Sequence, residues 1–236
     1  MRLFGRRKRT PDQDEAAVTA EVDAEGTDDA GAPERGPKDV ADADDSVSRL
    51  DLGSLRVRGV PGMELRLEVD EDRQRVIGAH LVLGESQMQV QAFAAPKSAG
   101  IWDEIRDEIA QGIATGGGTA ENIDGPLGTE LHARMPTSSG GRTVFTPARF
   151  VGWDGPRWFL RAVMSGHAAI DDAVAEQFYD LLDDIVVVRG EVPMAPREVL
   201  ALELPKTATA SDDDTQAAED SELNPFERGP EITEIR

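Results

Sequence analysis

The chain has 236 residues, with 46 acidic and 25 basic side chains and a formal net charge of −21. It contains no cysteine, which excludes disulfides, thiol nucleophiles and thiolate-bound metal. With only three histidines, we expect no metal site and no cofactor. Apolar runs fall far short of the roughly 18 residues that cross a bilayer, and no apolar stretch of a secretory signal follows the basic start. These features predict a cytoplasmic protein without a transmembrane segment.

The charge is distributed unevenly, and it divides the chain into three parts. Residues 1–10 carry basic but no acidic side chains, whereas 11–48 and 207–221 are acidic and have no periodic apolar face. Such segments cannot bury enough apolar surface to offset the entropy lost on ordering. We therefore predict a basic tip plus a disordered acidic spacer over 1–49, a folded domain over 50–205 and a disordered acidic tail over 206–236.

The first part of the domain has the alternating pattern of half-buried strands. Strands are predicted over 63–69, 75–83 and 86–94. The turn Gly84-Glu85 is short enough to join the last two as a hairpin. The period then changes, because Ile101, Ile105, Ile109 and Ile113 recur every four residues with acidic side chains between them. This stripe predicts an amphipathic helix that ends at three consecutive glycines, 116–118.

Further elements follow the glycines. Strands are predicted over 128–135, 143–153 and 157–165, a second amphipathic helix over 170–185, and a short strand over 186–188. The apolar stripe of the second helix consists of Ile170, Val174, Phe178, Leu181, Leu182 and Ile185. Clustered strands with two interspersed helices predict an α+β fold with a single, mainly antiparallel sheet.

Three short segments resemble a known family. They are residues 1–8 (MRLFGRRK), 155–161 (GPRWFLR) and 192–196 (VPMAP). Together they resemble the actinobacterial family called domain of unknown function 3710. The resemblance implies no known activity, cofactor, metal or catalytic residue. The order of strands and helices is also similar to that of Mog1/PsbP-like domains, which is a similarity of fold and does not establish function.

The predicted hairpin around Asp154-Gly155-Pro156 carries the candidate binding residues. A three-residue loop, with Trp153 opposite Arg157, would leave one face of the hairpin wholly apolar. The other face would then collect Arg149, Trp153, Arg157, Phe159 and Arg161. Arginines that face one another repel unless an anion or an aromatic ring lies between them. This face is therefore a candidate site for an anion or an acidic partner, although neutralisation by the protein's own carboxylates is the favoured interpretation.

The N-terminal tip is a second candidate contact. Five basic side chains surround two apolar ones there: Arg2, Leu3, Phe4, Arg6, Arg7, Lys8 and Arg9. Each basic residue is worth about 1 kcal/mol near an anionic leaflet, so weak and salt-sensitive contact with a membrane surface is expected. Contact with nucleic acid or with the adjacent acidic stretch are the alternatives, although the acidic domain itself is not expected to bind nucleic acid.

No recognisable catalytic set accompanies these features. We therefore favour a non-enzymatic cytoplasmic binding or adaptor domain with an unknown protein partner, which could sit at the inner face of the membrane through its tip. The alternative is an enzyme or small-anion sensor whose site lies beside the arginine-bearing hairpin. A deep cavity next to those arginines would favour the alternative.

Overall fold

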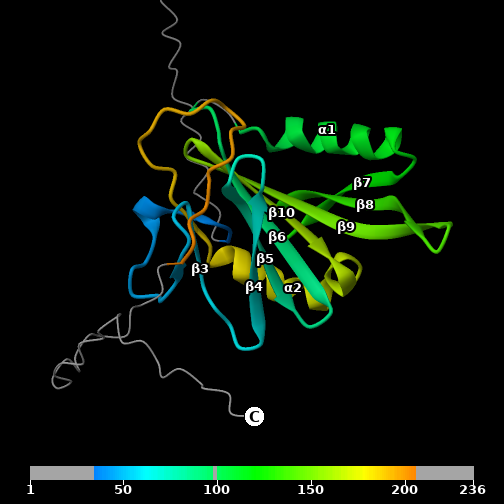
Figure 1. Cartoon of the computed structure of the whole chain (residues 1–236), viewed down its shortest axis with the longest axis horizontal. Helices are drawn as coiled ribbons and strands as arrows, with labels where there is room; N and C mark the ends of the chain where they lie inside the picture. Colours follow the sequence, from blue (N-terminus) through cyan, green and yellow to red (C-terminus); the bar gives the residue numbers. More distant parts are fainter. Residues whose placement is uncertain (1–34, 98–99, 206–236) are drawn as a thin grey trace, which may run out of the picture. The chain divides into compact units, whose positions relative to one another are not determined.

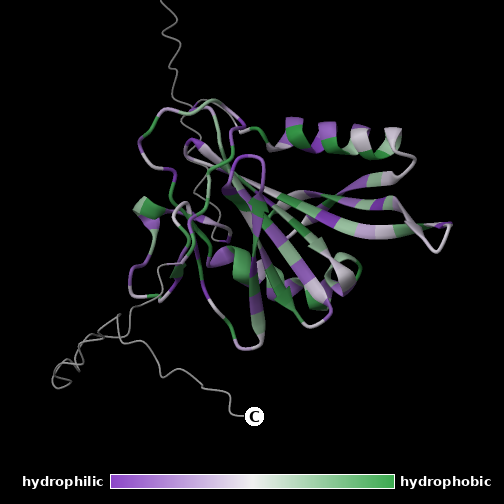
Figure 2. Cartoon of the chain, viewed as in Figure 1, coloured by the Kyte–Doolittle hydropathy of each residue, from purple (hydrophilic) through white to green (hydrophobic). Residues whose placement is uncertain are grey.

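The computed structural model describes residues 35–97 and 100–205. Its main feature is a seven-stranded antiparallel sheet with the order β4-β5-β6-β10-β9-β8-β7 (Figure 1). The strands are β4 Met63–Asp70, β5 Arg75–Leu83, β6 Ser86–Ala94, β7 Thr119–Gly125, β8 Gly128–Ser139, β9 Arg142–Gly155 and β10 Trp158–Ser165. Alternating hydrophobic and hydrophilic bands run along these strands (Figure 2), as expected where each side of a sheet has its own environment.

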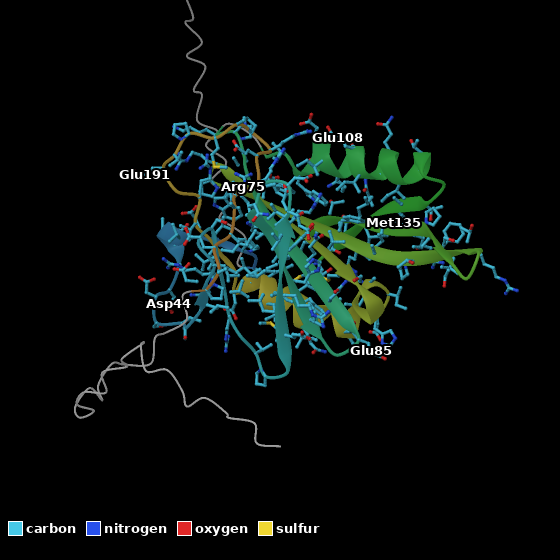
Figure 3. The ribbon with its side chains drawn as sticks, in the orientation of Figure 1. Asp44, Arg75, Glu85, Glu108, Met135 and Glu191 are labelled. Atoms are coloured by element: carbon cyan, nitrogen blue, oxygen red, sulfur yellow. The ribbon has the colours of Figure 1, made fainter. Side chains whose placement is uncertain are left out.

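The two helices lie on opposite faces of this sheet. Helix α1, Trp102–Thr115, connects β6 to β7 and packs against β7, β8 and β9 with its isoleucine stripe. Helix α2, Asp172–Asp183, follows β10 and packs Phe178 and Leu182 into the other core, which includes Leu160. Because Phe159 and Leu160 are adjacent in β10 and belong to the two different cores, the helices must cover opposite faces. Met135 lies on the part of the sheet near α1, and Glu108 on the outer side of that helix (Figure 3).

A second, smaller sheet has the order β1-β11-β3-β2. Its strands are β1 Lys38–Asp39, β2 Leu50–Asp51, β3 Leu55–Val57 and β11 Val186–Val187, with β1 parallel to β11 and the other pairs antiparallel. Two short 3₁₀ helices complete the described elements, η1 Val40–Asp42 and η2 Gly166–Ala169. In this sheet β11, which follows α2, pairs with β1 on one side and with β3 on the other.

The described part of the chain begins at Arg35, ahead of the boundary expected at residue 50. The Arg35 guanidinium contacts three carboxylates along α2: Glu176 at 2.9 Å, Asp180 at 2.9 Å and Asp183 at 2.7 Å. Asp39 accepts a hydrogen bond from the indole of Trp158 at 2.7 Å. The acidic spacer predicted over 11–49 therefore does not include 35–49, because a few specific contacts order a segment of low hydrophobicity. The rest of the spacer and the tail from 206 lie outside the described residues.

The predicted α+β class is confirmed, as are most of the strands and both helices. The strand expected over 186–188 is present as β11 of the small sheet, whereas the edge strand β7 and the strands β1, β2 and β3 were not predicted. The second helix also begins later than expected, so that Ile170 precedes it and is 65% exposed rather than part of the apolar stripe. The other members of that stripe, from Val174 to Ile185, do pack into the core.

Candidate functional site

Two adjoining cavities form one groove on the sheet face that carries α2. The first, of about 540 Å³, follows β7 and β8, and the second, of about 530 Å³, extends to the side of α2. They share the lining residues Ile123, His132, Ala169 and Ile170. One side of the groove is therefore the β7–β8 hairpin, and the other side is η2 with the first turns of α2.

A buried carboxylate lies at the bottom of the groove. Glu130 on β8 is only 1% exposed, and its Oε1 accepts a hydrogen bond of 2.5 Å from the hydroxyl of Tyr179 on α2. Its Oε2 lies 3.3 Å from Nε2 of His132, two residues along the same strand face. Such a group is stable in the interior only when hydrogen bonds replace its lost water.

The hydrogen bonds continue from Tyr179 to an arginine. Arg149 on β9 is 4% exposed, and its Nη1 donates to the Tyr179 hydroxyl at 3.1 Å. Its Nη2 pairs with Oδ1 of Asp172 at 2.7 Å, in the first turn of α2. Glu130, His132, Arg149, Asp172 and Tyr179 thus form one connected set, called the Glu130 network below. It joins β8 and β9 to α2.

Burial sets the protonation behaviour of this network. It raises the pKa of the Glu130 carboxyl, an effect that the hydrogen bonds from Tyr179 and His132 oppose. Burial, together with the hydrogen bond to Glu130, also raises the pKa of the Tyr179 phenol far above its usual value. At the rim, the hydrogen bond from Arg149 lowers the pKa of Asp172. Burial therefore shifts Glu130 and Tyr179 toward their protonated forms, whereas the contact with Arg149 shifts Asp172 toward its ionised form.

A glycine at the end of β7 makes room for the buried carboxylate. A Cβ at position 125 would overlap the Glu130 side chain, so only glycine fits there without displacing it. Gly125 and Gly128 pair across the two-residue turn Pro126-Leu127, which closes the β7–β8 hairpin.

The structure corrects the predicted register of the β9–β10 hairpin. Trp158 pairs with Gly155 across a two-residue loop, so that Trp153 lies opposite Leu160 and Arg149 opposite Met164. The sequence favours a three-residue loop because that register keeps one face of the hairpin wholly apolar. That criterion fails here because helices cover both faces of these strands, and each face therefore carries apolar side chains.

The five predicted hairpin residues consequently do not share a face. Arg149 and Trp153 face α2, and Arg149 enters the groove. Phe159 and Arg161 face the side of α1, where Arg161 donates to Gln91 and its guanidinium lies 5.4 Å from the Phe93 ring centroid. Arg157 is an exposed residue of the turn, with a φ of 63°. The tip residues Arg2, Leu3, Phe4, Arg6, Arg7, Lys8 and Arg9 lie outside the described residues.

The sequence did not reveal Glu130, His132 or Tyr179 as site residues. Glu130 and His132 occupy the polar positions of an alternating strand, a pattern typical of a solvated face. Tyr179 lies beside Phe178 in α2 and resembles any core aromatic. Only the packing of α2 over β8 and β9 converts these positions into a buried polar network. The one available signal was the spacing of Glu130, His132 and Arg134, which places three ionisable side chains on one strand face.

Within residues 35–97 and 100–205, no group of three or more histidine or acidic side chains has an arrangement that could hold a metal ion. In the same part of the chain, no helix is both long and apolar enough to cross a membrane. The expected absence of cofactors and of catalytic residues stays a prediction.

A family model described as "Protein of unknown function (DUF3710)" matches residues 36–211. The chain belongs to this family. The DUF3710 match spans both sheets, both helices and every residue of the groove, and it begins one residue after Arg35, the first described residue. Comparisons with curated proteins and with solved structures found no match. The similarity to Mog1/PsbP-like domains and the actinobacterial origin therefore stay predictions, and function has to be argued from the site.

Proposed function

We propose that this DUF3710 protein is a non-enzymatic cytoplasmic binding or adaptor domain that holds an extended segment of a partner protein in the groove. The observation that carries the proposal is the groove's position beside a free sheet edge. Strand β7 ends the seven-stranded order and pairs only with β8 among the described strands. Across the groove, Ile170 exposes 65% of its surface.

These two features suit an extended ligand. An open strand edge offers backbone donors and acceptors, and a neighbouring groove then reads the alternate side chains of the added segment. Ile123 and Ile170 supply apolar contacts on the two sides, and Pro147 lines the first cavity between them. Exposed Glu121 and Asp124 on β7 discourage pairing with a second copy of the same acidic edge.

The Glu130 network gives the groove a fixed base. Each of its polar side chains has a partner within the protein, and these partners come from β8, β9 and α2. Hydrogen bonds between side chains of different elements make a site more rigid and lower the entropy lost when a ligand binds. This rigidity supports a role in holding a partner.

The proposal is tested by placing a charge at the exposed apolar position. Ile170→Glu should remove one partner from the proteins that co-purify with the full chain, measured by quantitative mass spectrometry. The matched control is Val192→Glu, because Val192 is 71% exposed and lies outside both cavities. Loss of the same partners from both variants, or from neither, would contradict binding in the groove.

One observation favours the second candidate, an enzyme. Glu130 is a buried carboxylate with a raised pKa that lines a cavity beside Tyr179 and His132, an environment that general acids and bases use. Turnover of any compound in an activity screen that Glu130→Gln abolishes, while the variant keeps its fold, would replace the binding proposal by this one.

Membrane contact through the N-terminal tip remains a separate part of the proposal. The full chain should sediment with phosphatidylserine vesicles at low salt, and deletion of residues 1–9 should abolish this, because the basic side chains supply the attraction. Equal sedimentation of both proteins would contradict the membrane contact and leave the groove unaffected.

A further inference from the structure

The guanidinium of Arg149 is buried at the base of the groove and is only partly paired. Arginine has five N–H donors. Nη1 donates to Tyr179 and Nη2 to Asp172, whereas Nε is buried and finds no acceptor among the described residues. Arg149 is also more than nine-tenths buried and lines the second cavity. Buried donors without a partner are rare in native proteins and often mark the place of a missing water, ion or ligand.

The one carboxylate that pairs with Arg149 comes from the surface. The Asp172 side chain is 93% exposed, whereas that of Arg149 is 4% exposed. Asp172 is not needed to cap α2, since Asp171 is the N-cap and accepts from the backbone N–H of Ala173 and Val174. Arg149 is the only hydrogen-bond partner described for the Asp172 side chain. Ion pairs of exposed side chains contribute little stability, so this contact can be exchanged easily.

We propose that Arg149 is the receptor for a single oxyanion, a carboxylate or a phosphate group, and that Asp172 occupies the oxyanion's place in the free protein. An incoming oxyanion would take Nη2 from Asp172, which rotates into solvent, so that the charge on Arg149 stays neutralised throughout. Guanidinium groups bind carboxylate and phosphate through parallel N–H donors, and Arg149 has donors to spare.

The surrounding charges limit which oxyanion fits. Asp124 and Glu176 also line this cavity, and Glu121 lines the adjoining one. Runs of acidic residues, polyphosphates and nucleic acid would meet these carboxylates and be repelled. The site therefore suits one isolated oxyanion on an otherwise uncharged or apolar ligand, such as a lone acidic side chain, a chain terminus or a small organic acid.

This inference deepens the proposed function by naming an anchor within the same groove, but it can be tested without any partner protein. The probe is the Arg149 Nε–H signal in ¹H–¹⁵N NMR spectra of the full-length chain, assigned by its loss in Arg149→Lys. Acetate and inorganic phosphate are titrated separately, which distinguishes a carboxylate source from a phosphate source. Methylammonium serves as the cationic probe.

Asp172→Asn removes the competing carboxylate and should strengthen binding of at least one anion about tenfold relative to the wild type. The matched control Asp124→Asn removes an equal charge from the same cavity without touching Arg149, and should change the affinity less than about twofold. Asp172→Ser provides a second variant, should the asparagine retain the hydrogen bond to Arg149.

The inference would be overturned if neither acetate nor phosphate shifted the Arg149 signal in either Asp172 variant. An equal gain in anion affinity in Asp124→Asn would also overturn the inference, because it would show a general effect of charge rather than displacement of Asp172. Binding of methylammonium to the wild type that Asp172→Asn weakens would show a cation site instead. None of these results decides whether Ile170→Glu loses a partner, so failure of the oxyanion site and failure of the groove as a protein-binding surface remain distinguishable.

Discussion

Replacement of Tyr179 by Phe removes one hydroxyl from the centre of the Glu130 network. That hydroxyl donates to Glu130 and accepts from Arg149, and Tyr179 is only 1% exposed, so water cannot easily take its place. Hydrogen bonds to charged groups contribute about 1.5–3 kcal/mol each, and burial of an unpaired partner adds to the loss. Since the phenyl ring still fills the same space, we expect the free energy of unfolding to fall by about 2–4 kcal/mol.

The measurement is urea unfolding of the full-length chain at neutral pH, followed by tryptophan fluorescence. The slope with denaturant should stay unchanged, because the variant exposes the same surface when it unfolds. The matched control is Thr137→Val, which removes an exposed hydroxyl that lies 2.7 Å from Thr146 Oγ1. The control should lose less than about 1 kcal/mol, since water replaces an exposed hydrogen bond.

A loss below about 0.5 kcal/mol in Tyr179→Phe would refute the reasoning, because it would mean that the buried carboxylate and guanidinium do not depend on the hydroxyl. A double-mutant cycle with Glu130→Gln sharpens the result. The two positions should show a coupling free energy of at least about 1 kcal/mol, whereas independent sites would be additive within about 0.5 kcal/mol.

Three further predictions concern protonation and packing. Burial raises the pKa of Glu130, so this side chain binds a proton more tightly in the folded protein than in the unfolded chain. The protonated side chain therefore adds stability at a pH below the ordinary pKa of glutamate, and this contribution is lost as the pH rises through the pKa in the folded protein. The stability of Glu130→Gln relative to the wild type should therefore increase with pH in urea titrations, and a pH-independent difference would contradict the assignment. Tyr179 is the only tyrosine, and because its pKa is raised, tyrosinate absorbance should appear only when the protein unfolds at alkaline pH. Appearance of tyrosinate in the folded protein near the ordinary pKa of tyrosine would contradict the burial of this side chain. Gly36→Ala should destabilise by at least about 1 kcal/mol, because a Cβ there would lie 2.5 Å from the Trp153 ring at a φ of +125°, whereas the control Gly128→Ala has a similar φ of +111° but open space around the added Cβ. Equal thermal shifts for the two glycine variants would show that packing of residue 36 is unimportant.

Local periodicity predicted the elements that have a strong pattern of their own. The alternation in β4 to β6 and the four-residue isoleucine repeat of α1 each depend on a single boundary between apolar and polar surroundings. Strand β7 lacks such a pattern, because its sequence TAENIDG has few apolar residues and its pairing with β8 depends on the turn at Pro126-Leu127. The two- and three-residue strands of the small sheet are likewise held by contacts that are distant in sequence.

The candidate site was harder to predict because its burial is a tertiary property. Arg149 was expected to face other arginines, but the core on both sides of β9 and β10 fixes a different register. Its partner turned out to be Asp172, one of the acidic residues on the polar side of α2. Neutralisation by the protein's own carboxylates was the favoured interpretation of this face, and the ion pair between Arg149 and Asp172 is of that kind. The sequence singled out Arg149 as a candidate, but it could not show that Glu130 and Tyr179 lie in the same network.

The most direct test of the groove uses photo-cross-linking side chains on its two sides. Probes at positions 123 and 170 of the full chain occupy opposite sides of the groove, and a probe at position 192 serves as the control. The proposal predicts that the probes at 123 and 170 capture the same short segment of one partner, identified by mass spectrometry, and that the probe at 192 does not. Capture of unrelated proteins at 123 and 170, or equal capture at 192, would contradict a partner bound in the groove.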